Sequence, residues 1–225
     1  MGAHEIAQQL KERIKSKQIS RETFEELVEW CNGNLDKIDL SNSEQSYLYN
    51  QAIRYLMKPK HILEWNEKDA KLIITFFAKR ALKDLNLDDK TTIEILDIEE
   101  FENRGNSKKS NAVCVNHGDD TYSIQYSHKV IDNLLSRDTG KILRGFQTIF
   151  HEVVHAFQNS TMQKEGEKGP ETYLMAMESL ARKQAPEIYD ANYAHLLKEN
   201  NAEKLGLQLS MSYMKGMAPE LYRFI

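Results

Sequence analysis

Hydrophobic and polar residues follow a helical period over the first third of the chain. Apolar residues recur every three or four positions, as they do on the buried face of an amphipathic helix. This pattern predicts helices over 4–17, 20–31, 43–57 and 67–86. Ser20 and Asn66 stand where N-cap residues are expected, and Pro59 is placed to stop the third helix.

The period changes from helical to alternating near residue 91. Thr91–Ile98 alternates apolar and polar residues, which predicts a strand, and the polar stretch 102–110 predicts a loop. Two further β-rich runs, 112–115 and 121–127, flank the turn sequence HGDD and predict a hairpin. In the second of these runs, one predicted face carries Tyr122, Ile124 and Tyr126.

Helical periodicity returns after the predicted hairpin and continues to the end of the chain. We expect helices over 128–136, 139–161, 170–184 and 188–216. Helices, a small sheet and more helices form an α+β arrangement. We therefore divide the chain into an N-terminal helical region, 1–87, and a second domain, 88–225.

Composition and charge narrow the classes of protein that this pattern can represent. Hydrophobic residues make up 40% and charged residues 28% of the chain, which is typical of a globular protein. The net charge of −4 gives no basic surface for nucleic acid, and no apolar run is long enough to span a membrane. With no secretory signal visible, we expect a cytoplasmic protein, although export by another route stays open. Both cysteines, Cys31 and Cys114, lie among apolar residues and are expected to be free.

The sequence HEVVHAFQ at 151–158 carries the candidate chemistry. Residues four apart on a helix lie about 40° apart and one turn along, so His151 and His155 can bind one ion. Glu152 lies about 100° to the side, where it can reach a water on that ion without being a ligand. The helix also carries an apolar stripe for packing into the core, made of Phe146, Ile149, Phe150, Val153, Val154 and Phe157.

A catalytic zinc ion takes three protein ligands, so a third ligand is needed downstream. Position 158 is Gln and position 161 is Thr, so the HExxHxxGxxH continuation is absent. The candidates on later helices are Glu171, Glu178, Glu187 and Glu199. Glu199 is favoured because Ala202 and Gly206 on the same helix allow close approach to the histidine helix, and Glu178 is the alternative. Glu203, one turn after Glu199, is expected to accept the second N–H of a ligand histidine.

These residues together resemble the gluzincin branch of the zincin metallopeptidases. They are similar also to small bacterial zincin-like proteins, in which HExxHxxQ precedes a segment Tyr-x-x-Asn-Tyr…Glu-x-x-Ala-x-x-x-Gly, here 189–206. The resemblance covers roughly 91–216, and Glu199 follows His155 at a longer spacing than in thermolysin. It implies a zincin-like catalytic domain with an edge strand, 111–116 or 121–127, that binds extended substrate. It implies these roles: His151, His155 and Glu199 as Zn²⁺ ligands, Glu152 as general base and Glu203 as support for a ligand histidine.

The function that the resemblance implies is a zinc-dependent metallopeptidase acting on a peptide or protein substrate. Its oxyanion needs a further donor, for which His195 is favoured because it lies one turn before Glu199. Weaker candidates for that donor are Tyr193, Tyr213 and His117. The alternatives are another hydrolase using the same metal, a regulatory protease whose helical region recognises one protein partner, or a non-catalytic scaffold stabilised by metal. Neither nucleic acid nor membrane is an expected partner, and the oligomeric state is open.

Overall fold

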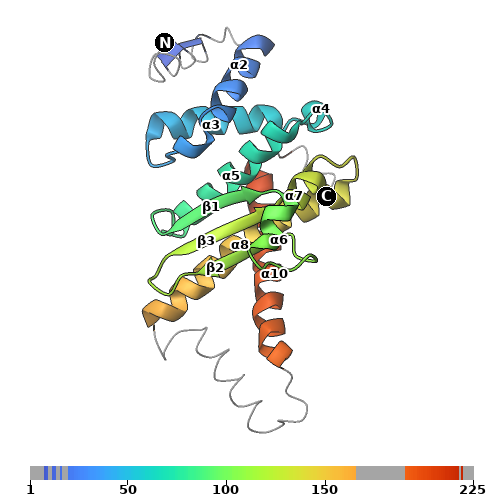
Figure 1. Cartoon of the computed structure of the whole chain (residues 1–225). Helices are drawn as coiled ribbons and strands as arrows, with labels where there is room; N and C mark the ends of the chain where they lie inside the picture. The colour runs from blue at the N-terminus through green and yellow to red at the C-terminus, as the bar shows by residue number, and fades with distance from the viewer. Residues whose placement is uncertain are drawn as a thin grey trace.

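The structure is a computed structural model, and it describes 20–165, 191–217 and 219, together with 8–9, 12–13 and 16. Of 162–165 and 191–198 it describes the backbone alone. This part of the chain combines helices with a three-stranded mixed sheet, so the predicted α+β class is confirmed (Figure 1). The predicted helix over 4–17 lies largely outside the described residues, and the one over 170–184 lies wholly outside them.

The N-terminal helices begin where the capping residues predict. They are α2 (Arg21–Asn32), α3 (Ser43–Leu56), α4 (Pro59–Ile62) and α5 (Glu67–Asp84), with a short 3₁₀ helix, η1 (Leu35–Lys37), between the first two. The Ser20 hydroxyl accepts the N–H of Thr23 at 3.3 Å. Asn66 and Asp69 accept one another's backbone N–H, which forms a capping box at the start of α5. Pro59 ends α3 as expected and also opens α4.

The sheet consists of β1 (Thr91–Leu96), β2 (Ala112–Asn116) and β3 (Tyr122–Ser127), in the order β1-β3-β2. The predicted hairpin is confirmed, because β2 and β3 pair antiparallel; β1 pairs parallel with β3. The first strand ends earlier than predicted. Asp97 accepts the N–H of Glu100 at 2.7 Å and so caps a short helix, α6 (Ile98–Asn103), which also takes the first residues of the predicted loop.

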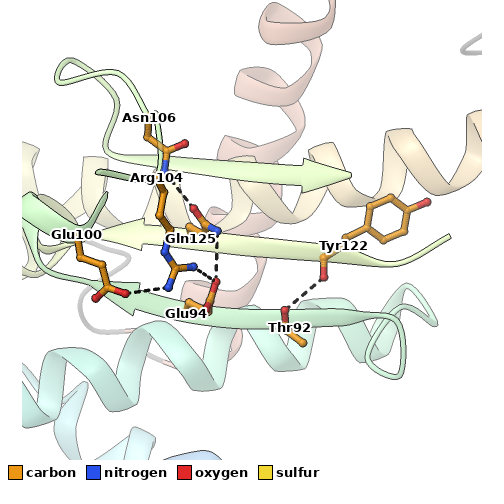
Figure 2. Close-up of polar contacts among 7 residues, drawn as sticks. All are labelled: Thr92, Glu94, Glu100, Arg104, Asn106, Tyr122 and Gln125. Carbon is orange, nitrogen blue, oxygen red and sulfur yellow. Dashed lines mark hydrogen bonds and ion pairs between the residues drawn. The ribbon is translucent and has the colours of Figure 1, made fainter. Parts of the chain in front are cut away.

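One face of the sheet is covered by α6 and the loop after it, through polar contacts that Figure 2 shows. Arg104 donates to Glu94 and to Glu100, at 2.8 Å each. Gln125 of β3 donates to Glu94 at 3.3 Å and accepts from Asn106 at 3.0 Å. All six residues of β3 are therefore buried, although polar and apolar residues alternate along it.

The opposite face of the sheet packs on the two helices that follow it, α7 (His128–Leu134) and α8 (Thr139–Glu165). The last helix, α10 (Ala191–Met217), packs in turn on α8. In Figure 1, α8 runs behind the sheet and α10 crosses α8. The ring of Phe77 in α5 lies 5.5 Å from that of Phe146 and 6.0 Å from that of Phe150, both in α8. The core is thus continuous across residue 87, where the sequence suggested a boundary.

The apolar stripe of α8 is buried as predicted, with one exception. Phe157, its last member, is 40% exposed, whereas Gln158 and Ser160 on a neighbouring face of the same turn are buried. Cys31 and Cys114 do not form a disulfide, as expected. Among the described residues, no helix is long and apolar enough to cross a membrane.

The hydroxyl of Tyr126 connects β3 to α8, because it donates to the carbonyl of Ile149 at 2.8 Å in a fully buried position. We expect Tyr126→Phe to lower the free energy of unfolding by about 1 kcal/mol, since the carbonyl loses its buried donor. Chemical denaturation measures the change. Tyr47→Phe is the control, because the Tyr47 hydroxyl has no hydrogen bond within the described residues; equal stability of the two variants would contradict the prediction.

Candidate metal centre

Three side chains from two helices converge at one point. The Nε2 atoms of His151 and His155, both on α8, lie 3.0 Å apart. Glu199 of α10 places its two carboxylate oxygens 3.0 Å from the His151 Nε2 and 3.1 Å from the His155 Nε2. One possible ligand atom from each of the three residues lies within 4.8 Å of the other two, so the group could hold a metal ion. The structure therefore brings together the three residues that the sequence nominated as ligands.

A close contact between the two helices places Glu199 there. Ala202 is fully buried, and Gly206 lies directly on the backbone of α8. A Cβ on Gly206 would come within 3.0 Å of the His151 nitrogen and 3.1 Å of its Cα. Only glycine allows this approach, and Ala202 continues the same narrow face one turn closer to Glu199. The two small residues thus set the distance from the carboxylate to the histidines.

The orientation of His155 depends on a residue to which sequence reasoning gave no role. The His155 Nδ1 lies 2.9 Å from the Oε1 of Gln158, whose side chain is 1% exposed. An amide oxygen only accepts, so Nδ1 carries the proton and Nε2 offers its lone pair to the centre. The i+3 spacing of Gln158 from His155 on one helix was the signal that could have identified this contact.

Glu152 lies beside the three candidate ligands without joining them. It is 6% exposed, and the backbone N–H of Cys114 in β2 donates to its carboxylate. Burial raises the pKa of Glu152 above its ordinary value, although the charges of His155 and His151 oppose this. The edge strand β2 thus holds the carboxylate of Glu152, which belongs to the HEVVH motif but is not one of the three candidate ligands.

The electrostatics of the cluster favour a cation between the three side chains. The contacts of Glu199 with His151 and then with His155 hold its pKa well below the ordinary value. Burial favours neutral His151, but its hydrogen bond to Glu199 and the charges of Glu152 and Glu199 outweigh burial and raise the His151 pKa. A proton or a metal ion therefore stabilises the close approach of these nitrogen and oxygen atoms.

A cleft of about 270 Å³ opens at the cluster between the start of β2, α8 and α10. His151, Glu152 and Glu199 line it, so the candidate ligands face an accessible space. The rest of its lining is Ser110, Asn111, Ala112, Arg144, Gln147, Thr148 and Glu203.

Other predicted site residues take different positions. Glu203 lines the cleft, but its hydrogen bond is with Gln147 at 3.5 Å and none of the described bonds joins it to a histidine, so its predicted support of a ligand remains a prediction. The Tyr213 hydroxyl donates to Asp84 and its ring stacks on Phe150, so Tyr213 is engaged with α5 and the core. His117 follows β2 in the exposed hairpin turn.

The remaining candidates fall outside the described residues or side chains. His195 and Tyr193 belong to α10 by their backbone, but their side chains are outside the described part. The alternative ligands Glu171, Glu178 and Glu187 also lie outside it. The oxyanion donor thus remains a prediction.

Comparison with known proteins gives no match to a family model, to a curated protein or to a solved structure.

The contact of Gly206 with α8 can be tested by adding one methyl group. We expect Gly206→Ala to destabilise the protein by about 1–3 kcal/mol and to weaken Zn²⁺ binding, because α10 must move away from His151. Denaturation and competition with a chromophoric chelator measure the two effects. Gly216→Ala is the matched control on the same helix, since no atom lies within 4 Å of its new Cβ. The same behaviour in both variants would contradict the assigned contact.

The role of Gln158 can be tested separately from the ligands. Gln158→Leu leaves the His155 Nδ1–H without its acceptor, and we expect Zn²⁺ affinity to fall about 10- to 100-fold. Gln158→Glu, which keeps an acceptor oxygen, should retain affinity within a factor of about 10. Isothermal titration with Zn²⁺ measures both variants, and an unchanged affinity in Gln158→Leu would remove Gln158 from the site.

Proposed function

We propose that the chain is a zinc-dependent metallopeptidase of gluzincin type. The observation that carries this proposal is the convergence of His151, His155 and Glu199 from two helices on one point, with Glu152 beside it in a cleft. The sequence resemblance on HEVVHAFQ and the Glu199–Gly206 segment supports the same assignment. A chance HExxH string on a packing helix has no reason to meet a distant carboxylate.

The residues fit a zinc ion in number, type and spacing. Two imidazoles and one carboxylate form the set of a catalytic site, which leaves a fourth position open. Tetrahedral ligands at about 2.0–2.1 Å from an ion lie about 3.3 Å from one another. The two imidazole nitrogens lie 3.0 Å apart, and each lies 3.0 or 3.1 Å from a different oxygen of Glu199, so the nitrogens are already near this spacing and the carboxylate has one oxygen beside each of them. Nitrogen and oxygen donors also accept other divalent transition metals, and the resemblance is what favours zinc.

The reaction that follows from this arrangement is hydrolysis of a peptide bond. Zinc, when bound, lowers the pKa of a water molecule and polarises the carbonyl of the scissile bond. Glu152 accepts the proton of the attacking water and returns it to the nitrogen of the leaving amine. The N–H of Cys114 holds the Glu152 carboxylate in position for both transfers. Gln158 accepts the N–H of the His155 Nδ1 and so directs Nε2, the nitrogen that would bind the metal, at the centre.

The position of β2 supports an extended peptide as substrate. β2 is an edge strand of the sheet. The odd-numbered residues of β2 form its backbone hydrogen bonds with β3, in register with the bonds that flank the strand, from the N–H of His117 to Thr121 and from the N–H of Ser127 to Asn111. Backbone groups of Ala112 and Cys114 therefore point toward the side where α8 lies. Ala112 lines the cleft, so a peptide can add to this edge with its backbone beside Glu152.

The decisive variant is Glu152→Gln, which keeps the size of the side chain and removes its basicity. We expect it to retain zinc and to lose about 10²- to 10⁴-fold in kcat/KM, because proton transfer is lost. The measurements are metal content by mass spectrometry and cleavage of casein and of a peptide library. Glu199→Ala, in contrast, should lose zinc itself.

Two results would contradict the proposal in different ways. Zinc bound with no Glu152-dependent cleavage of any peptide would favour a non-catalytic zincin-like scaffold. Unchanged zinc affinity in Glu199→Ala would show that the third ligand lies elsewhere.

A further inference from the structure

Arg144 is a cation in the cleft that the proposed reaction does not use. It projects from α8, is exposed and lines the cleft together with His151 and Glu199. Within the described part of the chain, no carboxylate forms an ion pair with its guanidinium. The three acidic residues that share the cleft have other contacts: Glu152 accepts the N–H of Cys114, Glu199 meets the histidines and Glu203 meets Gln147. The guanidinium is thus available to a ligand.

The position of Arg144 on α8 fixes its distance from the metal centre. It lies two turns before His151 and within about 20° of the same helix face, which corresponds to about 10.5 Å along the axis. Thr148 lies between them on this face, but its hydroxyl donates to the carbonyl of Arg144 at 2.9 Å. An extended chain advances about 3.4 Å per residue. Arg144 therefore meets a substrate group two or three residues from the scissile bond.

The direction of β2 determines on which side of the scissile bond that group lies. Residues 110–112, at the start of β2, line the cleft with Arg144, which is near the start of α8. Cys114, later in β2, bonds Glu152, later in α8. β2 and α8 therefore run side by side in the same direction (Figure 1). A peptide that pairs antiparallel with β2, the more stable pairing, approaches Arg144 with its C-terminal part.

We propose that Arg144 binds a carboxylate two or three residues to the C-terminal side of the scissile bond and so determines substrate specificity. This inference rests on the proposed peptidase function. A guanidinium binds a carboxylate with two parallel hydrogen bonds, which gives both direction and selectivity. Either an acidic side chain or the C-terminus of a short peptide supplies this carboxylate. Arg144 thus provides a positive subsite at the end of the cleft away from Cys114.

Cleavage-site profiling of the zinc-loaded full chain tests this inference. The probe is a mixed peptide library in two forms, with free and with amidated C-termini, and mass spectrometry identifies the products. We expect wild type to favour a carboxylate at the second or third position after the cleaved bond. Arg144→Gln should lower kcat/KM for these peptides about 10-fold and leave other peptides within about twofold. Arg144→Glu should shift the preference to Lys or Arg at the same positions.

Lys141→Gln is the matched control, because Lys141 is exposed on the same helix and does not line the cleft. A preference that amidation abolishes assigns the carboxylate to the peptide terminus, and one that persists assigns it to an acidic side chain. Cleavage by wild type without such a preference, or equal profiles for Arg144→Gln and Lys141→Gln, overturns the inference and leaves the peptidase function intact. Zinc binding without any cleavage instead contradicts the peptidase function, and the inference with it.

Discussion

The close packing of α10 on α8 is the constraint on which the candidate site depends. Because Gly206 rests on the backbone of His151, the two helix axes approach more closely than larger side chains allow. Glu199, two turns away on α10, is consequently held against His151 and His155 by main-chain geometry. A carboxylate on a loop would lose conformational entropy on reaching two imidazoles, whereas here helix packing has already fixed its position. The arrangement of His151, His155 and Glu199 therefore results from the packing of the small residues of α10 against α8.

The sheet fixes the second side of α8. Tyr126 bonds the carbonyl of Ile149, just before the histidine motif, and Cys114 bonds Glu152 within it. These contacts come from neighbouring strands of one hairpin, so the sheet determines how α8 is rotated about its own axis. Gly206 determines how far α8 lies from α10. Candidate catalytic and metal-binding groups are thus carried on rigid elements, as precise chemistry requires. The strand edge that orients Glu152 also borders the cleft, so the proposed substrate binding and proton transfer would share one structural element.

The parts of this structure that the sequence could predict are those encoded by local patterns. The capping box at Asn66, the alternating hairpin strands and the apolar stripe of α8 each need only neighbouring residues to be recognised. Helix α6 is not predicted, because Asp97 belongs to an alternating run in the sequence and only its bond to the backbone N–H of Glu100 shows that it is a cap. The parallel pairing of β1 with β3 joins segments across an intervening strand, which no local pattern specifies. The i+3 spacing of Gln158 from His155 is visible in the sequence, but the burial of Gln158 depends on tertiary packing and is not.

An aromatic cluster joins α5 to the two helices of the candidate metal centre and so connects that centre to parts of the core well beyond the cleft. Phe77 of α5 meets Phe150, on which Tyr213 of α10 stacks at 5.1 Å, and the Tyr213 hydroxyl reaches Asp84. In a single cooperative core, an ion that binds only the folded state adds its binding free energy to the stability of every element in that core. An ion bound as proposed would therefore protect N-terminal helices that it does not touch. Thermodynamic linkage would then make their resistance to unfolding a function of the concentration of free metal around the protein.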